Sequence, residues 1–163
     1  CWVMQAAQFA KYTGNREVLD FCRERYQTVL LPGQMDTDGS FPLELARTKP
    51  YGYSLFNLDA MATVCHILSD DTNNLWQYTT KDGRNMQKGV AWLCPYIKDK
   101  SAWPFEKDVM YWDEWPVAHT ALLFSVCDTP DEDYFSLWSE LEHFPENDEV
   151  IRNFPLRHPL LWL

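Results

Sequence analysis

The sequence lacks any apolar run that approaches the roughly 20 residues of a membrane-spanning helix. Basic residues are also scarce, since 14 Lys and Arg stand against 24 Asp and Glu and give a formal charge of −10. Nucleic acid is therefore not an expected partner, because its binding needs an extended basic surface. An anionic polymer is still compatible with this charge if the few basic residues converge in one cleft.

The five cysteines are odd in number and show neither CxxC nor metal-ligand spacing. We therefore expect no metal site and no cofactor. Cys22, Cys65 and Cys127 fall at apolar positions of predicted helices, where free cysteines are usually buried.

Aromatic residues, in contrast, are abundant. They make up 15% of the 163 residues and include eight Trp and eight Tyr. A chain of this length forms one domain, 1–163, with a substantial core, but that core does not need so many rings. Rings that stay at the surface stack on flat apolar ligands such as sugars.

Apolar residues recur at helical spacing in six segments, and no segment alternates as a strand does. The predicted helices are 2–12, 16–31, 54–68, 84–97, 115–126 and 133–144. Pro32-Gly33 is expected to end the second helix, Pro95 allows the fourth to end early, and the tail 145–163 is expected to run extended. Short turns make successive helices antiparallel. The predicted fold is all-α, with helical hairpins in a ring or arc and two long connections on one rim.

The connection from 34 to 57 is long, irregular and rich in charged and aromatic residues. Such segments inside a compact domain are usually functional. Tyr51 and Tyr53 are two apart, so in an extended segment both would point to one side, where one would serve as a stacking platform.

Residues 38–61, DGSFPLELARTKPYGYSLFNLDAM, resemble the signature of the alginate lyase superfamily of polysaccharide lyases, whose members share an α/α toroid. The family pattern is DGS-x-P-x-EL-x-R with a Tyr six or seven residues later, and Arg47 and Tyr53 stand in those places. The six-residue spacing is most similar to that of alginate and glucuronan lyases of gut Bacteroidota. The family also carries an Asn-His pair a little before the helix that begins this chain. The resemblance thus implies that 1–163 is the C-terminal part of a longer toroid.

The implied activity is β-elimination on uronic-acid polymers, alginate or glucuronan. Loss of the C5 proton requires that the neighbouring carboxylate be neutralised, and Arg47 suits that role because its guanidinium is always charged and bidentate. Tyr53 would protonate the leaving oxygen and, where the C5 hydrogen lies on the same face, also act as base. Its usual pKa of about 10 calls for nearby positive charge, which Arg47 and Lys49 offer.

Polar and aromatic side chains near this pair are the expected substrate contacts: Gln34, Glu44, Lys49, Tyr51, Asn57, Tyr111 and Trp112. Glu44 would orient Arg47, although the two also fit an ordinary surface ion pair. Tyr53 also fits a packed loop aromatic. The rings of 103–105 and 111–115 fit either substrate contact or closure of the core, and His66 and His119 fit core or helix-face positions.

Two other functions remain open. An inverting glycoside hydrolase needs two carboxyl groups roughly 6.5 to 9.5 Å apart, and Asp38 with Glu44, or Asp113 with Glu114, are the candidates. A non-catalytic carbohydrate-binding module would bind saccharide without turnover. Because large polysaccharides do not enter a cytoplasm intact, we expect a periplasmic or secreted protein.

Overall fold

The computed structural model describes residues 1–126 and 133–163, which are helical and contain no strand. The all-α prediction is confirmed. The α-helices are α1 (Trp2–Thr13), α2 (Arg16–Arg25), α3 (Leu31–Gln34), α4 (Pro42–Leu45), α5 (Pro50–Leu68), α6 (Met86–Lys98), α7 (Thr120–Ser125), α8 (Tyr134–Glu140) and α9 (Asp148–Arg152). Among the described residues, none of the helices has both the length and the apolar character of a transmembrane segment.

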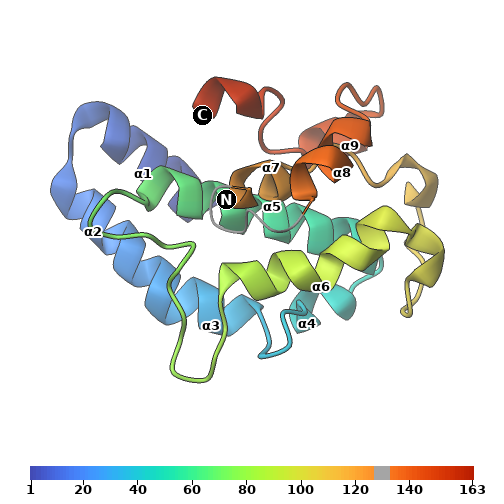
Figure 1. Cartoon of the computed structure of the whole chain (residues 1–163), viewed down its shortest axis with the longest axis horizontal. Coiled ribbons are helices and arrows are strands. Elements are labelled where there is room, and N and C mark those ends of the chain that lie inside the picture. The colour runs from blue at the N-terminus through green and yellow to red at the C-terminus, as the bar shows by residue number, and fades with distance from the viewer. Residues whose placement is uncertain (127–132) are drawn as a thin grey trace.

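Helices α1 and α2 form the predicted hairpin, visible at the blue end of the chain in Figure 1. Gly14 ends α1 in the left-handed conformation, with φ of 69°, which glycine adopts without a steric penalty. The Asn15 side chain then accepts a hydrogen bond from the Val18 N–H at 3.1 Å and caps α2.

The predicted stop at Pro32-Gly33 is wrong. The chain stays helical from Arg16 to Gln34, through a π-helical turn at Tyr26–Leu30. Pro32 lies just after the π-helical turn, at the start of α3. The helix ends only where Met35 takes an extended conformation.

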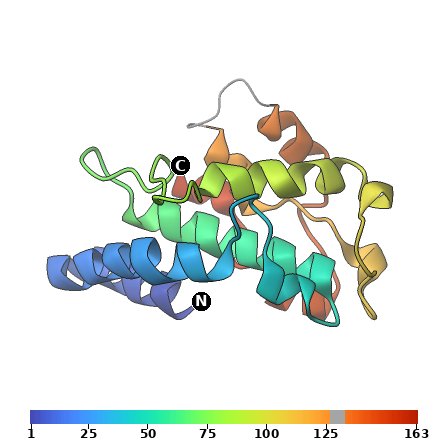
Figure 2. The same ribbon diagram turned by 90° about the horizontal axis from the view of Figure 1, so that it is seen from below.

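Helix α5 is the centre of the molecule and contacts α1, α2, α4, α6 and α7 (Figures 1 and 2). All of its residues are buried except Tyr53, Phe56 and His66, as expected of a helix that is covered all round. It begins at Pro50, four residues before the predicted start. Tyr51 and Tyr53 therefore lie on a helix, and the expectation of an extended segment is wrong.

The C-terminal half departs further from the prediction. Helix α6 passes Pro95 and ends at Lys98. The predicted helix 115–126 begins only at Thr120, because Pro116 removes a backbone donor and disfavours a helical Trp115. The tail is not simply extended, since Asn147 caps α9 and Pro159–Trp162 forms a 3-10 turn.

Buried polar contacts connect α5 to α7. The Asp59 carboxylate accepts hydrogen bonds from the Ala121 N–H at 2.9 Å and contacts His119 Nδ1 at 2.7 Å. His119 is buried, and His66 is half-buried on α5 and stacks on Phe124, so both fit the predicted core or helix-face positions. Cys22 and Cys65 are buried thiols as predicted, and Cys127 lies outside the described residues.

Candidate active site

Two cations lie against the ring of Tyr53. The Arg47 guanidinium carbon is 4.1 Å from the ring centroid, and Lys49 Nζ is 4.9 Å from it. Both bases precede α5, and Tyr53 lies in its first turns, on the face that α5 leaves half-exposed. The structure thus brings together the Arg, Lys and Tyr that the sequence motif singles out.

Lys49 is held by Glu149 from α9, 100 residues later in the chain. Burial by itself would lower the pKa of Lys49, but hydrogen bonds to Glu149 and Tyr53 outweigh it and raise the pKa. The same Lys49 hydrogen bond lowers the pKa of Glu149, which also pairs with Arg152. Lys49 is therefore a charged donor directed at the Tyr53 hydroxyl. Sequence reasoning missed Glu149 because it lies in the tail that was expected to run extended.

The two long connections meet beside this cluster, as predicted. The Val109 N–H donates to the Thr48 carbonyl at 3.1 Å. Buried Asp108 accepts from the Tyr51 and Gly52 N–H groups, at 2.8 and 2.9 Å, and so caps the start of α5. Burial raises the pKa of Asp108, although the two backbone hydrogen bonds act to lower it. No sequence signal near α5 predicts this cap, since Asp108 belongs to the connection that follows α6.

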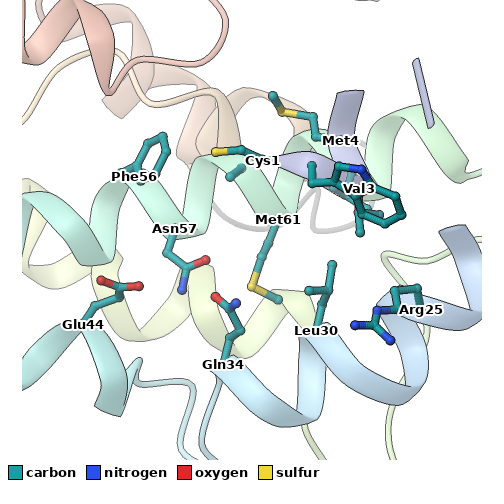
Figure 3. A pocket seen from close by; sticks show the side chains of 13 residues that line it. Cys1, Val3, Met4, Arg25, Leu30, Gln34, Glu44, Phe56, Asn57 and Met61 are labelled. Atoms are coloured by element: carbon teal, nitrogen blue, oxygen red, sulfur yellow. The ribbon is translucent and has the colours of Figure 1, made fainter. Parts of the chain in front are cut away.

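A pocket of about 360 Å³ lies between α1, α3, α4 and α5 (Figure 3). Gln34, Glu44 and Asn57 line it, and their side chains point toward one another between α3, α4 and α5. Glu44 also approaches Arg47 at 3.5 Å. Burial raises the pKa of Glu44, and the Arg47 charge opposes that rise. These three predicted substrate contacts therefore share one cavity, and Glu44 links it to the cationic cluster.

Tyr51 does not fit its predicted role. Its side chain is fully buried, its hydroxyl donates to the Tyr96 carbonyl at 2.9 Å, and its ring packs on Trp103 and Trp112. A ring in the core cannot stack on a sugar, so this expectation is wrong. Burial also raises the pKa of Tyr51 far above its ordinary value.

Tyr111 and Trp112 are half-buried and close to the cluster. Lys49 Nζ lies 5.1 Å from the Tyr111 ring centroid. Lys100 and Lys107 approach the Trp112 ring at 5.0 and 5.4 Å. Both aromatic residues therefore continue the cationic and aromatic surface that begins at Tyr53.

The carboxyl pairs proposed for a hydrolase gain no support. Asp38 accepts a hydrogen bond from the Ser40 N–H, and bonding to Ser40 lowers the pKa of Asp38, which makes it a poor general acid. Asp113 and Glu114 are exposed on a 3-10 turn. Within the described part of the chain, no group of three or more His, Cys, Asp and Glu is arranged to hold a metal ion.

The family model for alginate lyases matches residues 1–103. The chain belongs to the alginate lyase family. An alginate lyase from Bacteroides ovatus, known from its crystal structure, superposes with a TM-score of 0.75 at 30% sequence identity. The match covers 94% of this chain and 40% of that one, so the chain spans two-fifths of the length of that lyase. No curated protein matches the sequence.

Proposed function

We propose that the protein containing this chain cleaves uronic-acid polymers, alginate or glucuronan, by β-elimination. The observation that carries the proposal is the half-exposed Tyr53 with Arg47 and Lys49 against its ring, and with Glu44 joining Arg47 to a pocket that Gln34 and Asn57 also line. The cluster lies inside the segment that matches the alginate lyase family. We also propose that 1–163 is the C-terminal part of a longer α/α toroid, and that the whole protein acts in the periplasm or outside the cell.

In this mechanism Arg47 pairs with the C5 carboxylate of the bound sugar. Its side chain is 54% exposed, and Glu44 fixes one side of the guanidinium while the other stays open to substrate. Pairing with Arg47 neutralises the carboxylate and makes the C5 hydrogen more acidic. The negative charge that develops at C5 as the proton leaves then spreads onto a carboxylate whose own charge is already compensated. Gln34 and Asn57 would orient the ring through its hydroxyl groups.

The bond changes follow from the position of Tyr53. A base takes the C5 proton, the C5–H electron pair becomes the C4=C5 double bond, and the C4–O bond breaks. Tyr53 donates its hydroxyl proton to the departing oxygen, and Lys49 stabilises the phenolate that remains. On substrates whose C5 hydrogen faces Tyr53, Tyr53 instead starts as the phenolate, takes the C5 proton and then gives that proton to the departing oxygen. For substrates of the opposite C5 configuration we propose that the base is the histidine of the family's Asn-His pair. His119 of this chain is not a candidate, since it is buried in the core.

The test is ultraviolet absorbance from unsaturated uronide ends, measured with the full-length product of the gene on alginate and glucuronan. Tyr53→Phe should lower the rate by about 100-fold or more, the usual contribution of a proton-transfer group. Tyr12→Phe, a change at an exposed tyrosine on α1, is the control and should be neutral. Absence of absorbance on every uronate polymer, from a folded protein, would reject the lyase assignment.

A further inference from the structure

A second pocket, of about 310 Å³, lies beyond Tyr111 and is lined by Lys100, Ser101, Trp103, Phe105, Lys107 and Trp112. We propose that this pocket, here named the distal pocket, binds a second uronate unit of the polymer, with Lys107 contacting its carboxylate. The inference rests on the proposed function, because it assumes that the ligand is an anionic saccharide.

The charge distribution favours an anionic ligand at this place. The chain carries a formal charge of −10, yet four of its basic residues lie against aromatic rings of the candidate active site and the distal pocket. Arg47 and Lys49 contact Tyr53, Lys49 also contacts Tyr111, and the Trp112 ring lies near two further lysines. A local concentration of positive charge on an acidic protein attracts an anion to that region.

The two lysines of the distal pocket have different roles. Lys100 Nζ donates to the carbonyls of Trp112 and Trp115, at 2.9 and 2.8 Å, and so supports the backbone. Lys107 is exposed and has no ion pair within residues 1–126 and 133–163. Burial lowers the pKa of Lys100, and the Lys107 charge adds to that lowering, while the Asp113 and Asp108 carboxylates oppose it. Lys107, rather than Lys100, is therefore the lysine available to a ligand carboxylate.

The rings of the distal pocket favour a sugar over a simple anion. Phe105 is 42% exposed, and Trp112 is half-buried. The Trp103 ring centroid lies 5.1 Å from that of Phe105, and the buried Tyr51 ring packs on both Trp103 and Trp112. Rings present apolar faces on which the C–H face of a sugar stacks, while Lys107 provides the charge. A uronate has both features, whereas a neutral sugar would not use Lys107 and a phosphate would not use the rings.

The distal pocket also lies next to the candidate active site. Trp112 follows Tyr111, whose ring contacts Lys49. In Figures 1 and 2 the connection after α6 lies at the same end of the molecule as the start of α5, and the Val109–Thr48 hydrogen bond joins the two segments. A polymer chain bound at Tyr53 therefore reaches the distal pocket by extending along one rim.

The test compares long and short substrates with the full-length protein. Lys107→Gln should lower kcat/KM on the polymer by about tenfold, the equivalent of one hydrogen bond to a charged group. The loss on the shortest oligosaccharide that is cleaved should be much smaller, because that substrate does not extend to the distal pocket. Lys81→Gln, at an exposed lysine before α6, is the matched control and should change neither value. Equal losses on both substrates, or no loss on the polymer, would overturn the proposal.

A binding measurement separates this proposal from the lyase assignment. Calorimetry with uronate oligosaccharides and with neutral oligosaccharides of equal length requires no turnover. Weaker binding of the uronates alone to Lys107→Gln would support the distal pocket even if the protein released no unsaturated product. Equal uronate affinity of wild type and Lys107→Gln would reject the distal pocket, whatever the outcome of the lyase assay.

Discussion

Glu149 connects the C-terminal part of the chain to Tyr53 through Lys49. Its carboxylate pairs with the lysine whose ammonium group hydrogen-bonds the tyrosine hydroxyl. Lys49 and Glu149 are both largely buried, so each limits the freedom of the other. We therefore regard Glu149 as a positioning residue, which acts on the substrate only through Lys49.

Glu149→Gln should lower the free energy of unfolding by about 1 kcal/mol at pH 7, the upper value for a partly exposed ion pair. The pKa of Glu149 is lowered from 4.5, so its contribution is present above pH 4.5 and is lost as pH falls through the lower folded value. The pKa of Lys49 is raised from 10.5, so its contribution is present below pH 10.5 and is lost as pH rises through the higher folded value.

Urea denaturation of wild type and Glu149→Gln at several pH values measures this difference. The difference in urea midpoint between the two proteins should be constant near neutral pH. It should disappear at acid pH, where Glu149 is protonated. Arg152→Gln, which removes an exposed partner of the same carboxylate, is the control and should have a smaller effect. A gap of unchanged size at acid pH would contradict the ion-pair explanation.

At the scale of elements, the start of α5 depends on the connection that follows α6. Asp108 caps the helix, and Gly52 leaves the space that this close approach needs. A Cβ at Gly52 would lie 2.7 Å from Trp115 Nε1 and 2.9 Å from Asp108 Oδ2. Neither atom belongs to the far end of a flexible side chain, so the connection itself would have to move.

Gly52→Ala should therefore destabilise the protein by about 1–3 kcal/mol, as overpacking of a core does, and should lower activity because Tyr53 is the next residue. The readouts are the urea midpoint and the ultraviolet assay. Gly33→Ala is the matched control, since a Cβ at Gly33 meets nothing within 4 Å and alanine favours the helix. Equal stability of both variants would show that the space beside Gly52 is not needed.

Local patterns account for the elements that were predicted well. Helices α1, α2 and α6 follow from apolar spacing and from Gly14 or Asn caps, which are contained in a few neighbouring residues. The Arg47 and Tyr53 pair follows from a contiguous motif. The early start of α5 does not follow from any local pattern, because its cap is Asp108, more than 50 residues away in the sequence. Glu149 was missed for the same reason, and the burial of Tyr51 depends on the Tyr96 carbonyl of α6 and on rings of the following connection.

At the scale of the whole molecule, a net negative charge coexists with an exposed aromatic stripe. Trp2, Phe9 and Tyr12 recur at helical spacing on α1, and Phe21 of α2 contacts Trp2 edge to face. Phe9 is 71% exposed and Tyr12 is 87% exposed. Exposed apolar surface of this kind drives association, whereas a charge of −10 opposes it by mutual repulsion.

The 163-residue chain by itself should therefore self-associate more strongly as salt is added, because salt screens the repulsion and leaves the aromatic contact. Phe9→Ser with Tyr12→Ser should shift the equilibrium toward monomer at every salt concentration, as measured by sedimentation velocity. A double change at rings on the other side of the molecule, Phe135→Ser with Phe144→Ser, is the matched control, since both are exposed on or after α8. If both double variants associate like wild type, the α1 stripe does not mediate association. If association weakens as salt is added, attraction between opposite charges rather than aromatic contact holds the copies together.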